Sequence, residues 1–188
     1  MAQAKALTQQ ELDQVLHYVS TKKYAARDRA LVMTSFLSGM RAKEIASLRF
    51  KDVMNDDGTI KQEIRLSADM TKGRHGRTVF LSERLREELA NYAKTRAMNH
   101  PQMPVFFTSN RAGFNANGLC QHFWWLYKRA GVSGASSHSG RRTFITKLAE
   151  KGIGVRVLAS LAGHRSIAVT QRYIDVNDEM KRRAVELI

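Results

Sequence analysis

Sequence patterns typical of helices recur along most of this 188-residue chain, and strand-like patterns are confined to residues 52–81. Thr8 and Glu11 have the spacing of a capping box, which predicts a helix from there to about residue 19. Gly39 is the expected C-cap of a second helix over residues 25–38, and Gly163 is the expected cap of a short helix over residues 155–161. Further helices are predicted over residues 42–48 and 82–98, from Asn115 or Asn117 to about 131, from His138 to about 152, and over residues 155–161, 167–174 and 178–188.

The sequence of residues 52–81 predicts three short strands, at residues 53–54, 60–66 and 78–81. A turn sequence rich in Asn, Asp and Gly separates the first two strands. Residues 71–77 carry two glycines and several basic side chains, so they should form a cationic hairpin tip between the last two strands. Residues 105–107 are too short a segment to classify. The predicted fold is therefore mainly α with a small antiparallel β-sheet, an α+β class.

The chain carries a formal net charge of +14, and 43% of its residues are hydrophobic. This length and apolar content suit one soluble globular domain. Such an excess of positive charge favours a polyanionic partner, and nucleic acid is the usual one. A merely solubilising surface or a ribosome-associated protein is the alternative. We favour nucleic acid because basic residues recur beside the candidate site residues.

Cys120 is the single cysteine, so no disulfide can form within the chain. No apolar run approaches the roughly 20 residues that a membrane-spanning helix needs. Residues 1–5 lack the apolar core of a signal peptide. The expected location is therefore the cytoplasm, without membrane association.

One segment, residues 138–173, gathers side chains suited to phosphoryl transfer. His138 and Arg141 stand three positions apart, a spacing that brings them to one face of a helix. His164 follows, and Tyr173 comes nine residues later. The set contains a possible nucleophile, two imidazoles that can move protons, and a guanidinium shaped to bind two phosphate oxygens. It contains no cluster of carboxylates, so it indicates phosphoryl transfer without a metal.

Two upstream cations complete this candidate catalytic set. Arg41 directly follows a predicted helix cap, a junction that would hold its side chain firmly. Lys72 lies in the predicted hairpin tip, where it can reach a leaving oxygen as a general acid. Taken singly, each residue is more often structural than catalytic: Arg41 as a surface cation, for example, or Tyr173 as a core tyrosine. Their joint occurrence on a basic chain favours the catalytic interpretation.

These residues lie in motifs that resemble the tyrosine recombinases, the phage-integrase family. The motifs are Ser38-Gly39-Met40-Arg41-Ala42-Lys43-Glu44-Ile45, Thr71-Lys72-Gly73, His138-Ser139-Gly140-Arg141, Leu161-Ala162-Gly163-His164 and Tyr173. The resemblance covers roughly residues 8–174. It implies a site-specific recombinase that joins a DNA 3′ phosphate to tyrosine, with neither a metal nor another cofactor. Its implied catalytic residues are Arg41, Lys72, His138, Arg141, His164 and Tyr173.

The resemblance also implies double-stranded DNA as the partner and a homotetramer on paired DNA sites. We expect further DNA contacts from Lys43, Arg74, Arg77, Arg142 and Arg165. Residues 178–188 form a possible docking helix for a neighbouring subunit, or alternatively pack on their own domain. The aromatic residues in the helix after residue 115, Trp124 among them, could stack on bases, but we expect them to pack in the core.

The chain departs from the family pattern at three points. Arg142 stands where the family often has histidine, and Ala162 replaces a common leucine. The first arginine motif comes early, at Arg41, so residues 1–188 are expected to form a single catalytic domain without an N-terminal DNA-clamping domain. The chain would then be either a truncated catalytic domain or a minimal recombinase of the kind that runs inversion switches.

Three other functions remain open at this point. A type IB topoisomerase also uses a tyrosine, but usually has lysine or arginine where His138 stands. A DNA-binding protein of the same fold that has lost catalysis would not need the complete residue set. A metal-dependent nuclease would need a carboxylate cluster, and its activity would not survive EDTA.

Overall fold

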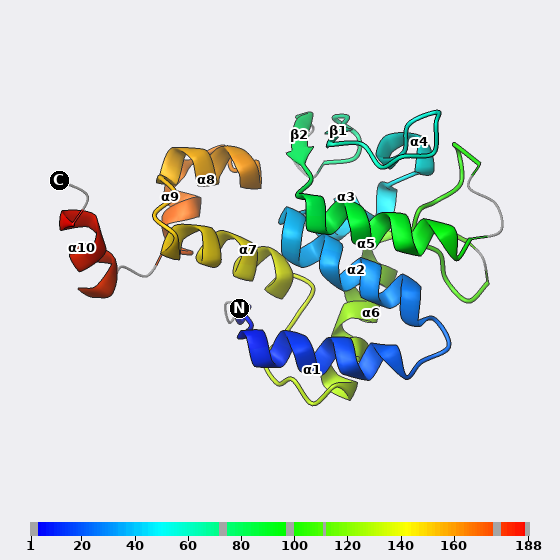
Figure 1. The fold of residues 1–188 in the computed structure, drawn as a ribbon, viewed down its shortest axis with the longest axis horizontal. Coiled ribbons are helices and arrows are strands. Elements are labelled where there is room, and N and C mark those ends of the chain that lie inside the picture. The colour runs from blue at the N-terminus through cyan, green and yellow to red at the C-terminus, as the bar shows by residue number, and fades with distance from the viewer. Residues whose placement is uncertain (1–3, 72–74, 97–99, 111, 175–177, 187–188) are drawn as a thin grey trace.

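The structure, a computed structural model, describes residues 4–71, 75–96, 100–110, 112–174 and 178–186. The described residues form ten helices and a two-stranded sheet, which lies at one edge of the molecule (Figure 1). In chain order they are α1 Gln9–Ser20, α2 Ala25–Ser38, α3 Ala42–Ser47, α4 Phe50–Val53, β1 Glu63–Leu66, β2 Arg77–Phe80, α5 Glu83–Lys94, α6 Ala116–Arg129, α7 Ser139–Glu150, α8 Val155–Ala162, α9 Ile167–Gln171 and α10 Asp178–Val185.

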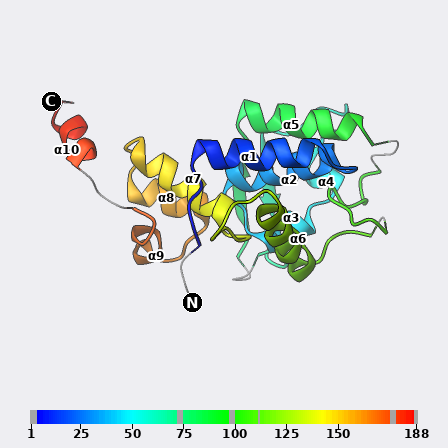
Figure 2. The same cartoon turned by 90° about the horizontal axis from the view of Figure 1, so that it is seen from below.

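Helix α2 is the centre of the fold. It packs against α1, α5 and α7, while α3 packs against α6 (Figures 1 and 2). Most of its residues are buried, including the polar Thr34 and Ser35. Only five of its ten buried residues are apolar, and the others include Arg27 and Asp28, which form a buried ion pair. Two parts of the predicted site adjoin this helix, because Arg41 lies directly after its C-cap and α7 packs against it.

Local sequence signals set the helix ends. The Thr8 hydroxyl accepts from the backbone N–H of Glu11, whose carboxylate accepts from the Thr8 N–H in return. Asn115 caps α6 by accepting from a backbone N–H of its first turn. Gly39 and Gly163 end α2 and α8 in the left-handed conformation, with φ of +62° at each. The predicted capping box and both glycine caps are confirmed.

The sheet is smaller than the sequence predicted. Strands β1 and β2 pair antiparallel, with Ile64 opposite Val79, and both of these side chains are buried. The prediction of a third strand at residues 53–54 is wrong, because Val53 ends helix α4 and Met54 makes only an isolated bridge to Ile60. The turn at residues 55–58 is present, but it links a helix to a strand.

Other predicted boundaries shift by a few residues. Helix α5 ends at Lys94 rather than near residue 98. His138 is the N-cap of α7 rather than part of the helix, and Tyr173 lies in a turn two residues beyond α9. The expectation that Trp124 packs in the core is wrong, since the residue is 43% exposed while its neighbour Phe123 is fully buried.

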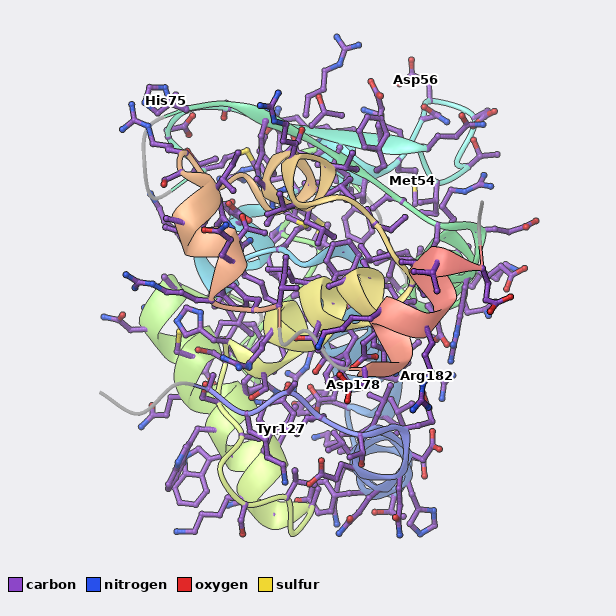
Figure 3. All side chains as sticks on the ribbon, turned by 90° about the vertical axis from the view of Figure 1, so that its left-hand side faces the viewer. Met54, Asp56, His75, Tyr127, Asp178 and Arg182 are labelled. Atoms are coloured by element: carbon purple, nitrogen blue, oxygen red, sulfur yellow. The ribbon has the colours of Figure 1, made fainter. Side chains whose placement is uncertain are left out.

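Helix α10 lies apart from the other helices in both ribbon views (Figures 1 and 2). Asp178 and Arg182 of this helix face the viewer in Figure 3. In the part of the chain that the structure describes, no helix is both long and apolar enough to span a membrane.

Candidate active site

Arg41 connects the end of α2 to the start of α3. It is the N-cap residue of α3, and its backbone N–H donates to Glu44 Oε2 at 2.8 Å. Its guanidinium donates to Glu44 Oε1 at 3.0 Å and to the Gly163 carbonyl at 3.3 Å. The left-handed turn at Gly39 brings the chain directly from one helix into the other. The local fold thus orients the side chain that the sequence predicted at this junction.

Arg141 lies in the first turn of α7 and is only 3% exposed. Its guanidinium donates to the Gly39 carbonyl at 2.7 Å and to the Ala162 carbonyl at 2.6 Å. Burial, and next the nearby charge of Arg41, lower the pKa of Arg141 to about 10. The group therefore remains a cation at neutral pH.

Three successive carbonyls at the C-terminal end of α8 each accept from a different arginine. Arg77 donates to Leu161 O at 2.7 Å, Arg141 to Ala162 O and Arg41 to Gly163 O. The end of a helix leaves its last carbonyls without partners and carries partial negative charge. This helix end therefore holds three guanidinium groups close together despite their mutual repulsion.

Glu44 balances part of that positive charge. Its side chain is fully buried, and its two oxygens accept from Arg41 and Arg77, the latter at 2.8 Å. Burial alone would raise the pKa of this carboxyl, but the hydrogen bonds and charges of Arg77 and Arg41 outweigh it and leave the pKa below its usual value. Glu44 is therefore ionised.

His164 and Tyr173 meet beside this arginine cluster. Their rings stack with centroids 5.5 Å apart and planes inclined at 23°. Nδ1 of His164 is 2.9 Å from the hydroxyl oxygen of Thr170, a fully buried residue in α9. Burial, followed by the charges of Arg141, Arg41 and Arg77, lowers the pKa of His164 to about 4. The imidazole is therefore neutral at physiological pH.

Side chains of helix α7 also contact Tyr173. The Thr146 hydroxyl donates to the Tyr173 backbone carbonyl at 3.2 Å, and the Arg142 guanidinium lies 5.6 Å from the centre of the Tyr173 ring. These two side chains are four positions apart, on the same face of α7. The helix that carries Arg141 thus also fixes the segment that carries the tyrosine.

An open pocket of about 450 Å³ lies next to these groups. Its walls come from the α2–α3 junction, the hairpin base, the α8–α9 turn and α9, and Figure 3 shows His75 above α9 on this side of the molecule. The residues that line it include Arg41, Thr71, His75, Arg77, His164 and Arg165. The pocket is cationic and open to solvent, as a site for a phosphate in a polymer must be.

The remaining predicted catalytic residues are less fully described. Lys72 and the predicted DNA contact Arg74 lie outside the described residues. The segments flanking them reach the pocket, because Thr71 and His75 line it. His138 is exposed at the N-cap of α7, three residues before Arg141.

The other predicted DNA contacts differ in their surroundings. Arg165 is exposed at the pocket rim. Lys43 donates to the carbonyls of Asp69 and Thr71, at the base of the hairpin. The side chain of Arg77 is only 10% exposed and is committed to Glu44 and Leu161 O. DNA contact by these residues, and by Arg142 beside Tyr173, stays a prediction.

Two groups in this cluster were not foreseen from the sequence as site residues, Glu44 and Thr170. Glu44 follows Arg41 by three positions at a helix start, which is a recognisable capping-box spacing. Thr170 carries no comparable signal, because only the tertiary fold brings it to His164. Among the described residues no group of three or more His, Cys, Asp or Glu is arranged to hold a metal ion.

The sequence profile of the phage integrase family matches residues 5–180, nearly the whole chain. The chain belongs to the phage integrase family. It is 27% identical to tyrosine recombinase XerA of Pyrococcus furiosus and 30% identical to that of Thermococcus kodakarensis, over 97% of its own length in both alignments. These alignments cover 61% and 62% of the two relatives, so the chain spans about three fifths of their length.

Solved structures share the fold of this family member. A XerA recombinase crystal structure superposes with a TM-score of 0.78 at 24% identity, covering all of this chain and 66% of the other. The catalytic domain of bacteriophage HP1 integrase gives a TM-score of 0.66 at 20% identity, with 91% and 87% covered. XerH bound to palindromic difH substrate gives a TM-score of 0.69 at 21% identity, covering 96% of this chain and 51% of the other. The predicted α+β recombinase fold is confirmed.

Proposed function

We propose that residues 1–188 are the catalytic domain of a site-specific DNA recombinase that cuts and rejoins strands through a 3′-phosphotyrosyl intermediate on Tyr173. The main support is the meeting of Arg41, Arg141, His164 and Tyr173 from separate segments beside one cationic pocket. Family membership and the net charge of +14 support DNA as the substrate. The relative XerH, in its pre-cleavage and post-cleavage complexes, is bound to a named DNA site.

In the proposed reaction the Tyr173 phenol oxygen attacks the scissile phosphorus, and the bond from phosphorus to the 5′ oxygen breaks. His138 accepts the phenol proton, and Lys72 gives a proton to the departing 5′ oxygen. Arg41 and Arg141 bind the non-bridging oxygens, and His164 donates a further hydrogen bond to them. A 5′ hydroxyl from a second strand then attacks the phosphotyrosine and releases Tyr173, so no external energy source is required.

The cation cluster matters because a protonated phenol is a poor nucleophile, and nearby positive charge stabilises the negative charge that develops during its attack. Preorganised donors aimed at a developing oxyanion each contribute on the order of 10²- to 10³-fold in rate. Here the donors are fixed before DNA arrives, through Glu44 and the end of α8. The site therefore needs little rearrangement to stabilise the pentavalent transition state.

Recombination between two DNA sites also requires two pairs of subunits, and we propose a homotetramer on paired sites. Helix α10 lies apart from the domain body in Figures 1 and 2, as expected for a segment that docks on a neighbouring subunit. Deletion of residues 178–188 should leave single-site binding intact and abolish the four-subunit complex in analytical ultracentrifugation with DNA. A tetramer that survives the deletion would contradict this role.

The reaction can be tested by trapping the intermediate. The protein is incubated in EDTA with DNA nicked next to the scissile phosphate, so that the 5′ fragment diffuses away and religation is blocked. Candidate sites from the host genome or a selected pool supply the DNA. A denaturing gel should show a protein–DNA adduct, and peptide mapping should locate it on Tyr173. An adduct on another residue would overturn the proposal.

Matched variants separate chemistry from binding. Tyr173→Phe removes only the phenol oxygen, so it should bind DNA normally and form no adduct. Arg41→Ala and Arg141→Ala should lose cleavage far more than affinity. Binding without any adduct from wild-type protein would favour a DNA-binding protein of this fold, and site-independent relaxation of supercoiled DNA would favour a topoisomerase-like activity.

A further inference from the structure

Thr170 and His164 make a partly buried polar contact next to the pocket. Thr170 is fully buried in α9, and its hydroxyl oxygen lies 2.9 Å from Nδ1 of His164. His164 itself lines the pocket, whereas Thr170 does not. Nδ1 of the imidazole is therefore hydrogen-bonded to the protein. The second ring nitrogen, Nε2, is left to interact with a group in the pocket.

The direction of this hydrogen bond follows from the needs of the hydroxyl. A neutral imidazole has one N–H donor and one acceptor nitrogen, whereas a hydroxyl needs an acceptor for its proton. In the described part of the chain, His164 Nδ1 is the one hydrogen-bond partner of the Thr170 hydroxyl. If Nδ1 carried the proton, the hydroxyl proton would be buried without an acceptor, which costs roughly 1–3 kcal/mol. The favoured arrangement has the hydroxyl donating to an unprotonated Nδ1.

We infer that Thr170 is a positioning residue that holds His164 as the tautomer with its proton on Nε2, so that the neutral ring presents an N–H donor to the phosphate. This inference rests on the proposed function, in which His164 contacts a non-bridging oxygen. The low pKa of His164 is consistent with it, because the ring stays neutral across the physiological range.

The tautomer also limits what His164 can do in the reaction. With Nδ1 occupied by the Thr170 hydroxyl and Nε2 already protonated, the ring has no free lone pair for the phenol proton of Tyr173. His164 stacks on that phenol ring at 5.5 Å without being able to act as its base. The two histidines then have separate tasks, proton transfer by His138 and hydrogen-bond donation by His164.

Nitrogen NMR of the DNA-free protein tests the tautomer without any activity assay. In protein labelled with ¹⁵N-histidine, two-bond proton–nitrogen correlations distinguish a protonated ring nitrogen from an unprotonated one, and His164→Gln assigns the signals. We expect Nε2 protonated and Nδ1 unprotonated in wild type, unchanged between pH 6 and 8. Thr170→Val should mix the two tautomers, and Thr170→Ser should retain the wild-type pattern.

Thr146→Val is the matched control, because it also removes a threonine hydroxyl, but one that donates to the Tyr173 carbonyl and not to an imidazole. It should leave the His164 signals in the Nε2-protonated pattern. A proton on Nδ1 in wild-type protein would overturn the inference, even if Thr170→Val failed to fold. Identical tautomer signals in folded Thr170→Val and wild type would also overturn it.

The adduct assay gives the functional counterpart. Thr170→Val should slow adduct formation by up to about 10²-fold, the usual effect of losing one oxyanion donor, with DNA affinity unchanged. Thr170→Ser should restore most of the rate. Loss of affinity equal to the loss of rate would indicate a structural role only. Failure of wild type to form any adduct would instead count against the proposed function and leave the NMR result standing.

Discussion

Glu44 shows how one side chain can govern the charge of a whole site. It is the buried carboxylate that neutralises part of the charge on Arg41 and Arg77. Removing one partner of a buried ion pair leaves uncompensated charge, which typically destabilises a protein by about 3–5 kcal/mol. The stability of the domain and the geometry of its arginines therefore depend on the same carboxylate.

Glu44→Gln should lower the free energy of unfolding by about 3–5 kcal/mol at pH 7, because both arginines lose their anionic partner. The pKa of Glu44 is depressed in the folded protein, so its contribution is present above the ordinary glutamate pKa and is lost as pH falls through the folded value. Urea unfolding at pH 7 and at acidic pH should show the difference between wild type and variant shrinking on acidification. A difference that is constant with pH would contradict the ionised assignment.

Tyr127 presents the opposite case, a buried polar atom without a partner. The ring is fully enclosed, and in the described part of the chain its hydroxyl has no hydrogen-bond partner. Burial raises the pKa of this phenol above its usual value. Figure 3 labels the residue on α6.

Tyr127→Phe should leave the free energy of unfolding unchanged or raise it by up to about 1 kcal/mol, because an unsatisfied buried hydroxyl is removed. Tyr92→Phe is the control, since its hydroxyl donates to the Val105 carbonyl at 2.8 Å. That variant should lose about 1 kcal/mol, because the short hydrogen bond is removed and the Val105 carbonyl keeps only a longer one, of 3.5 Å, from Arg96. Urea denaturation measures the free energy of unfolding of both variants. An equal decrease in the two would show that the Tyr127 hydroxyl has a hydrogen-bond partner.

The packing of α7 on α2 depends on a close helix crossing at Gly140. A Cβ placed there would lie 2.2 Å from the Ser35 hydroxyl oxygen and 3.0 Å from the Ser35 backbone carbon. Neither atom can move away easily, because Ser35 sits inside the most buried helix of the fold. The glycine thus sets the distance between α2 and the helix that carries Arg141.

Gly140→Ala should force the two helices apart, destabilise the domain by about 1–3 kcal/mol as overpacking does, and reduce adduct formation more than DNA affinity. Gly154→Ala is a suitable control, because a Cβ there meets nothing within 4 Å and the backbone has an ordinary φ. Thermal unfolding and the adduct assay on both variants provide the comparison. Normal cleavage by a folded Gly140→Ala protein would show that Arg141 tolerates the shift.

The difference between predicted and observed structure has physical causes at the level of elements. Helices with caps and apolar stripes were predictable because their signals are local, as at Thr8, Gly39 and Gly163. The wrong strand at residues 53–54 came from a β-branched residue that tertiary packing holds in a short helix. The role of Thr170 was not predictable, since it depends on the folding of α9 against His164.

For the molecule as a whole, the net charge of +14 should make DNA binding strongly salt dependent, because bound phosphates release counterions. A plot of log affinity against log salt concentration should fall steeply for wild type. Arg165→Gln, at the exposed pocket rim, should reduce the slope by about 1 if the side chain contacts a phosphate. Arg29, paired with Glu88 at 2.6 Å, supplies the comparison variant Arg29→Gln. An unchanged slope for Arg165→Gln would remove it from the predicted DNA contacts.

The end of α8, where three arginines share successive carbonyls, has a consequence for how this protein responds to its solution. Folding brings those cations together against their mutual repulsion. An anion that enters the pocket therefore stabilises the folded state, whereas the unfolded chain has no such site. Mass action then requires that sulfate or inorganic phosphate raise the melting temperature in proportion to the logarithm of its concentration once the pocket is saturated. Anions of the storage buffer would therefore compete with DNA phosphates for the same arginine-lined pocket.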